Sequence, residues 1–108
     1  MHHRSALRAQ ADLPVTVYAD GYVFDCRTAD VSTQGMRLAS VGGLAHHTAR
    51  PVYLIEFPFD SGSALAIARP AWWRGGEAAF HFVAMSDCDR LSIAERMDAS
   101  RKIDLALF

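Results

Sequence analysis

The sequence contains few cysteines, almost no lysine and no long apolar run. Its two cysteines, Cys26 and Cys88, form no C-x-x-C pair, so we expect two free thiols, with a single disulfide as the alternative. No apolar stretch reaches the ~18 residues that a membrane-spanning helix needs, and the N-terminus carries no apolar signal segment. These absences predict a cytoplasmic protein without membrane insertion.

The charges are balanced in number but uneven in kind. The 108 residues carry a formal net charge of −1, so no global field attracts the chain to a nucleic-acid polymer or a membrane. All basic residues except Lys102 are arginines, whose planar guanidinium matches phosphate oxygens and the edge of guanine. This bias either serves recognition or reflects a GC-rich genome.

Alternation of apolar and polar residues predicts six short strands in a single domain over residues 13–108. Asp20-Gly21 predicts a hairpin, and Arg74-Gly75-Gly76 predicts a second tight turn. The strands are expected at residues 13–18, 22–28, 36–39, 51–57, 64–73 and 78–83. The pattern is typical of a mainly β fold, a small six-stranded antiparallel β-barrel with a C-terminal α-helix.

A helical period replaces the strand period near the end of the chain. Ser86 suits an N-cap, and a helix is expected at about residues 87–102. Leu91, Ala94 and Met97 repeat every three residues and form one apolar stripe. Residues 103–108 are an apolar tail that must pack on the barrel or on a partner.

Residues 1–12 show no period and are expected to form a flexible ligand-binding arm. They hold Arg4 and Arg8 in an R-x-x-x-R pattern. Each guanidinium can bind a phosphate through two hydrogen bonds, grip the O6/N7 edge of guanine, or stack on a purine. Alone, the pattern is more often a solvated arm than a binding site.

A second motif, D-x-S-x-x-G, follows the second expected strand. Asp30 can accept two hydrogen bonds from the N1–H and amino group of guanine, and Ser32 can serve a phosphate or the turn itself. Gly35 permits a positive φ and a close approach of the backbone to a ligand. Alone, a turn capped by its own side chains explains the same residues.

In this order and at this separation, the two motifs resemble those of the PilZ domain family, bacterial receptors for cyclic di-GMP. The resemblance covers nearly the whole chain: arm, barrel and C-terminal helix. It implies that Arg4 and Arg8 grip the phosphates and guanine of the dinucleotide, and that the opposing contacts come from Asp30, Ser32 and Gly35.

Some members of the family add an aromatic or basic residue from a later strand. Trp72 is the best match here, and Arg74 is a second candidate. The alternative is that one of Trp72 and Trp73 faces the core while the other covers the barrel end.

The resemblance predicts a cyclic di-GMP receptor that orders its N-terminal arm over the barrel when the ligand binds. We expect no enzyme activity, no metal and no cofactor, because the histidines and cysteines match no zinc spacing and no catalytic motif is present. A downstream protein partner of unknown identity is expected, and a homodimer is a further option. The alternative is a PilZ-like interaction adaptor that does not bind the nucleotide, while near-neutral charge disfavours binding to single-stranded nucleic acid.

Overall fold

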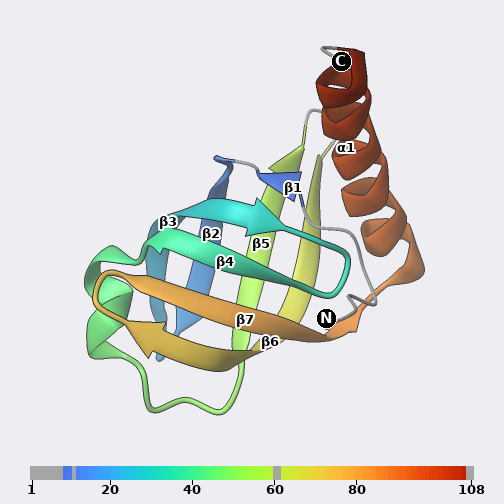
Figure 1. Ribbon diagram of the computed structural model, residues 1–108. Coiled ribbons are helices and arrows are strands. Elements are labelled where there is room, and N and C mark those ends of the chain that lie inside the picture. Colours follow the sequence, from blue (N-terminus) through green and yellow to red (C-terminus); the bar gives the residue numbers. More distant parts are fainter. Residues whose placement is uncertain (1–8, 11, 60–61, 107–108) are drawn as a thin grey trace.

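The computed structural model describes residues 9–10, 12–59 and 62–106, which form a closed antiparallel barrel and one helix (Figure 1). The strands are β1 (Ala9–Gln10), β2 (Pro14–Ala19), β3 (Tyr22–Val31), β4 (Gly35–Ser40), β5 (Tyr53–Phe59), β6 (Gly62–Arg74) and β7 (Glu77–Met85). They follow the order β1-β3-β2-β5-β6-β7-β4, and pairing of β3 with β4 closes the barrel. The predicted six-stranded barrel with a C-terminal helix is confirmed, and β1 adds a short strand within the expected arm.

Local turn chemistry explains the two tight hairpins. Asp20 and Gly21 have φ values of 55° and 80°, the pair of positive angles that a two-residue type I′ turn requires. Gly75, in the turn between β6 and β7, has a φ of 61°. Both predicted turns are therefore present. A 3₁₀ helix (Gly42–His46) lies within the long connection between β4 and β5.

The barrel interior pairs large residues on one strand with small residues on the next. On β5, Tyr53 and Phe57 are fully buried, and their register partners on β6 are Ala68 and Ala64. This alternation of size fills the narrow interior of a small barrel. Because side chains alternate along a strand and the alanines of β6 face inward, Leu65 and Ile67 of β6 face outward.

A bulge in β3 changes which residues face the interior. Cys26 and Thr28 are buried, so strict alternation would bury residue 30 as well. The pairing of β3 with β4 shifts register between Thr28 and Asp30, and after the shift Val31 is buried while Asp30 reaches the outer surface. Bulges commonly re-aim a side chain in this way.

A second bulge does the same in β6. Ala66 and Ala68 are buried, and the pairing with β7 shifts register between Pro70 and Trp72. As a result Trp73 packs against the core, and Trp72 faces outward.

The helix α1 (Asp87–Ala106) extends beyond the predicted end at residue 102 and includes Ile103–Ala106 of the expected tail. Ser86 is the N-cap, since its hydroxyl accepts the N–H of Asp89 at 3.0 Å. The predicted stripe is wrong at Leu91, which is 58% exposed, whereas Ile93 is buried at 1%. The helix is oriented instead by Asp89, whose carboxylate accepts the backbone N–H of Leu65 at 3.1 Å.

The two cysteines are free thiols, as expected. Burial, followed by the charge of Asp25, raises the pKa of Cys26 to about 11, so this thiol stays protonated at neutral pH. Cys88 lies exposed at the start of α1. Within the part of the chain that the structure describes, no helix is long and apolar enough to cross a bilayer.

Candidate ligand-binding site

The two arginines of the R-x-x-x-R motif, Arg4 and Arg8, lie outside the described residues. The chain immediately after Arg8 is described and pairs with the strand that bears the second motif. In this pairing Ala9 is opposite Val31, and Gln10 is opposite Asp30. The backbone leaving the arm is thereby fixed beside Asp30.

The D-x-S-x-x-G motif forms a turn that its own groups stabilise. Ser32 is 2% exposed, and its hydroxyl accepts the N–H groups of Gln34 and Gly35 at 3.1 and 3.2 Å. The N–H of Ser32 donates to the Gly35 carbonyl at 2.9 Å. The structure shows the turn role expected for Ser32, and its contact with a phosphate stays a prediction.

Gly35 does not have a positive φ, which corrects the expectation from the sequence. A Cβ at this position would lie 2.4 Å from the backbone oxygen of Phe80, far inside contact distance. The glycine is therefore needed because β4 and β7 approach each other closely at the point where the turn begins the strand.

Helix α1 holds the same turn from outside the sheet. Arg90 donates from Nη1 to the carbonyl oxygen of Thr33 at 2.5 Å. On the sheet side, the N–H of Phe82 donates to the carbonyl of Gln34 at 2.8 Å. The turn is thus fixed at both sides, which gives Asp30 a rigid support.

Four outward side chains lie in register across four neighbouring strands, and we call them the polar row: Asp30 (β3), Arg37 (β4), Ala79 (β7) and Trp72 (β6). Asp30 is opposite Arg37, Arg37 is opposite Ala79, and Ala79 is opposite Trp72. Adjacent strands are about 4.8 Å apart, so the row spans about 14 Å. Two site residues far apart in sequence, Asp30 and Trp72, are thereby brought onto one face.

Arg37 is a residue of this site that reasoning from the sequence missed. Its Nε lies 3.1 Å from Asp30 Oδ2, and its Nη1 lies 3.4 Å from Glu77 Oε1. The Asp30 side chain is 16% exposed, and that of Arg37 is 37% exposed. The available signal was position: Arg37 alternates with buried Met36 and Leu38, so it had to face outward from the strand that follows the motif.

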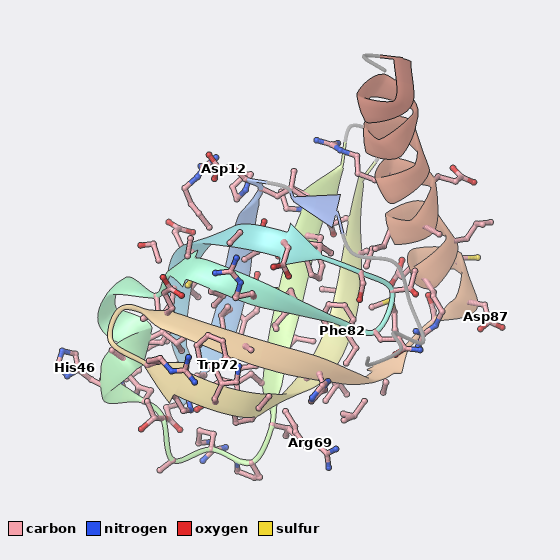
Figure 2. All side chains as sticks on the ribbon, viewed as in Figure 1. Asp12, His46, Arg69, Trp72, Phe82 and Asp87 are labelled. Atoms are coloured by element: carbon pink, nitrogen blue, oxygen red, sulfur yellow. The ribbon has the colours of Figure 1, made fainter. Side chains whose placement is uncertain are left out.

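At the other end of the row, Trp72 presents an indole ring braced by Arg74. The guanidinium carbon of Arg74 lies 4.6 Å from the centroid of the Trp72 ring, a cation–π arrangement (Figure 2). Trp73 instead packs edge-on against Tyr53 and Phe80, with ring centroids 5.9 and 5.5 Å apart. The position Ala79, between Arg37 and Trp72, carries only a methyl group, so the row is low in its middle and raised at both ends.

A hollow of about 560 Å³ opens beside Arg37 of the polar row. Its lining includes Arg27, Arg37 and Asp12, and Arg27 Nε lies 2.6 Å from Asp12 Oδ1. This pairing raises the pKa of Arg27, which is charged at all physiological pH values. The hollow and the row together contain two guanidinium groups, two carboxylates and one indole, and each guanidinium is paired with a carboxylate.

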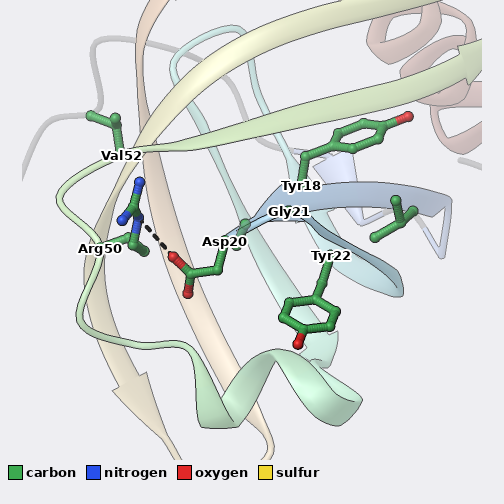
Figure 3. A pocket seen from close by; sticks show the side chains of 8 residues that line it. Tyr18, Asp20, Gly21, Tyr22, Arg50 and Val52 are labelled. Carbon is green, nitrogen blue, oxygen red and sulfur yellow. Dashed lines mark ion pairs between the residues drawn. The ribbon is translucent and has the colours of Figure 1, made fainter.

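The connection between β4 and β5 contains His46 and His47, and we call it the histidine loop. It lies at the other end of the β2–β3 hairpin from Asp30. Asp20, at the hairpin tip, contacts His47 Nδ1 at 2.9 Å. It also pairs with Arg50 Nε at 3.1 Å (Figure 3). The His47 ring packs on Tyr22 and Phe24, with centroids 5.3 and 5.1 Å away. These contacts give the loop a structural role, and the described residues contain no group of three acidic, histidine or cysteine side chains placed to hold a metal ion.

Comparison with solved structures supports the barrel assignment. The inhibitor of motility MotI/DgrA of Bacillus subtilis is similar over 96% of this chain and 53% of its own, with a TM-score of 0.76 and 11% identity. The PilZ domain of CeSA from a cellulose-synthesizing bacterium gives a TM-score of 0.66 at 18% identity, covering 86% of this chain and 96% of that one. The PilZ domain of Escherichia coli YcgR, solved with c-di-GMP, gives 0.65 at 16% identity, covering 95% of each chain.

The chain therefore spans about half the length of MotI and nearly the full length of the two isolated PilZ domains. A search of curated proteins found no match. The PilZ domain model matches residues 2–97, and the chain belongs to the PilZ domain family.

Proposed function

We propose that this chain is a cyclic di-GMP receptor domain whose ligand lies on the polar row and is held from above by Arg4 and Arg8. The observation that carries the proposal is the register of the row, which places Asp30 and Trp72 on one outer face. The strand that leaves the arm pairs directly beside Asp30. A planar purine fits such a row, because the row combines an acceptor, a low centre and an aromatic end.

Each group in the row has a distinct task. Asp30 accepts the N1–H and amino protons of guanine, and Arg37 orients the carboxylate through Oδ2. Trp72 stacks on a base, with Arg74 behind its ring. Ser32 and Gly35 contribute by shaping the turn rather than by direct contact.

In this proposal the signal is a change in the N-terminal arm, residues 1–12. Arg4 and Arg8 carry the positive charge that the phosphates attract, and ligand binding orders residues 1–12 over the barrel, which creates a new surface for a protein partner. The domain acts by binding and not by catalysis, and it works in the cytoplasm, where the second messenger is made.

Isothermal titration calorimetry with cyclic di-GMP tests the proposal, and cyclic di-AMP serves as the comparison ligand. We expect saturable heat with cyclic di-GMP and none with cyclic di-AMP, because adenine offers no donor pair to Asp30. Arg8→Ala is expected to weaken binding at least tenfold, as a charged phosphate contact is lost. Absence of heat at ligand concentrations well above micromolar would contradict the proposal.

The second candidate function is an interaction adaptor that does not bind the nucleotide. The observation favouring it is a set of large apolar side chains exposed on the barrel, including Val23, Leu54 and Ile67 at 61%, 39% and 42% exposure. The same calorimetry separates the two candidates.

A further inference from the structure

A second row of outward side chains crosses five strands, and we call it the apolar row: Val23 (β3), Tyr18 (β2), Leu54 (β5), Ile67 (β6) and Ala84 (β7). In the strand register, Val23 is opposite Tyr18, Tyr18 is opposite Leu54, Leu54 is opposite Ile67, and Ile67 is opposite Ala84. No charged side chain interrupts the row. Contiguous apolar surface of this kind marks an interaction site on a soluble protein.

Further apolar side chains widen the row on both sides. Leu65 is 44% exposed, Val52 is 49% exposed and Val83 is 50% exposed. Leu54, Leu65, Ile67 and Ala84 line a groove of about 460 Å³ that ends at the start of α1. At the other end, Tyr18 and Val52 line a second hollow of about 270 Å³ (Figure 3). The apolar row therefore has a hollow at each end, into which side chains of a partner can insert.

Acidic side chains border one side of the apolar row. Asp25 is opposite Thr16, Thr16 is opposite Glu56, and Glu56 is opposite Leu65, whose N–H donates to Asp89. These residues lie two positions along each strand from the row, about 7 Å away. Hydrogen bonds from Tyr18 and then Ser63 lower the pKa of Glu56, so this flank keeps its negative charge at neutral and mildly acidic pH.

Basic side chains border the opposite side. Arg69 is the next outward residue of β6 beyond Ile67, and it is exposed and opposite His81 of β7. Arg50 lies beside Val52 at the edge of the second hollow, with its side chain 55% exposed, and it pairs at 3.1 Å with Asp20, which lines the same hollow. Asp20 offsets the charge of Arg50, so Arg69 supplies the net positive charge on this side of the apolar row, opposite the acidic flank.

We propose that the apolar row is the contact face of a homodimer, with a second copy of this chain as its occupant. A twofold axis along the row superimposes apolar on apolar and places the acidic flank of each copy on the basic flank of the other. Such antisymmetry about a central apolar line is the self-complementary pattern that an isologous twofold interface needs. A different partner would need its own complementary charges, whereas a second copy of this chain already carries both an acidic and a basic flank.

This inference does not depend on nucleotide binding, because the polar row and the apolar row share no residue. Arg37 and Trp72 stay accessible in the dimer, so ligand binding and dimerisation are expected to be separable.

Sedimentation velocity over a concentration series from about 1 to 500 µM tests the proposal, a range suited to an interface at the small end of the specific size classes. We expect a concentration-dependent shift from monomer to dimer in the wild-type chain. A monomer over the full series would overturn the proposal and would assign the row to another occupant.

Ile67→Glu places a charge at the centre of the row and is expected to give a monomer throughout. The control is Leu91→Glu, at an exposed apolar residue on α1 with 58% exposure against 42% for Ile67, and this variant is expected to dimerise as the wild type does. Circular dichroism checks that both variants are folded. A dimer that survives Ile67→Glu, or one that is lost with Leu91→Glu, would overturn the assignment to this face.

The flanks have a separate test. Arg69→Glu is expected to weaken the dimer about fivefold, since it sets like charges against each other across the interface. Adding Glu56→Lys to Arg69→Glu exchanges the two flanks and is expected to recover part of that loss. If the double variant is weaker than Arg69→Glu alone, the proposed antiparallel alignment of the flanks is wrong.

Discussion

The polar row and the apolar row are built in the same way, as outward side chains in register across neighbouring strands, yet they present opposite chemistry. In the polar row, Asp30 and Arg37 pair with each other and the one large apolar ring, Trp72, is braced by a guanidinium. In the apolar row the charges stand only at the borders. The two proposals therefore assign a charged planar ligand and a protein to separate surfaces of one small barrel.

Strand β6 contributes to both rows, and its bulge separates them. Before the bulge, the outward positions are Leu65 and Ile67, which belong to the apolar surface. After the bulge, the outward positions are Trp72 and Arg74, which belong to the polar site. The same strand changes its chemistry because one extra residue shifts its alternation.

The largest expected effect concerns the two tryptophans that follow the bulge, of which Trp72 faces outward and Trp73 packs on the core. Trp73→Ala is expected to lower the free energy of unfolding by about 3 kcal/mol, because its ring packs on Tyr53 and Phe80. Trp72→Ala is expected to lower it by less than about 1 kcal/mol, the range of a cation–π contact. Urea unfolding followed by circular dichroism measures both.

Ligand affinity should show the reverse order for the same pair. Trp72→Ala is expected to weaken cyclic di-GMP binding about tenfold through the loss of stacking, with dimerisation unchanged. Equal stability losses in the two variants would contradict the placement that the bulge gives them.

The next effect separates two carboxylates of the same strand. Asp30→Ala is expected to weaken cyclic di-GMP binding about 30- to 100-fold, because the guanine donors lose a charged acceptor. Asp25→Ala removes an exposed carboxylate on the acidic flank and is expected to leave affinity within twofold while weakening the dimer. Calorimetry measures nucleotide affinity and sedimentation measures dimerisation. A loss of nucleotide affinity in Asp25→Ala would contradict the separation of the polar row from the apolar row.

A smaller effect is expected at the turn that supports the polar row. Gly35→Ala forces a Cβ against the Phe80 carbonyl oxygen and should cost about 1–3 kcal/mol of stability, the usual range for overpacking. Gly76→Ala is the control, since a Cβ there meets no atom within 4 Å. Thermal unfolding compares them, and an unchanged melting temperature for Gly35→Ala would show that β4 and β7 can separate at this point.

The smallest effect lies on the acidic flank of the apolar row. Tyr18 donates to Glu56 at 2.6 Å and is the main cause of the lowered pKa of that carboxyl. Because the folded pKa lies below the ordinary 4.5, this stabilisation is present above that value and is lost as pH falls through the folded pKa. Tyr18→Phe should move the pKa back toward 4.5.

Carbon-13 NMR titration of the Glu56 carboxyl follows this change. Ser63→Ala removes the second hydrogen bond, at 2.9 Å, and should give a smaller shift in the same direction. A larger shift for Ser63→Ala would reverse the assigned order of causes. Neither variant is expected to alter nucleotide binding.

Much of the fold was predictable because its signals are local. Asp20-Gly21 fixed a hairpin through the φ values that its turn requires, and alternating residues placed all six strands of the barrel. Ser86 was identified as the N-cap because capping, too, is a local signal, and its hydroxyl accepts the N–H of Asp89. The helix stripe failed at Leu91 because the orientation of α1 is set by distant contacts, including the one from Asp89 to Leu65.

The candidate site residues were proposed from the sequence, and their register on the barrel came only from the structure. Asp30 and Trp72 were identified through a family resemblance, whereas Arg37 became visible only when β4 was seen between β3 and β7. The positive φ expected at Gly35 was wrong, and the structure adds a close approach to β7 as a reason for the glycine. The close approach of its backbone to a ligand stays a prediction.

By itself, then, the sequence determined strand and helix positions and turn chemistry, because these depend on neighbours within a few residues. It also indicated the family, through two motifs and their order along the chain. Tertiary structure alone decided that Asp30 and Trp72 face outward on one row and that Leu65 and Ile67 face outward on another. The physical reason is that bulges and registers are set by hydrogen bonds between strands far apart in the chain, and by the limited volume inside the barrel.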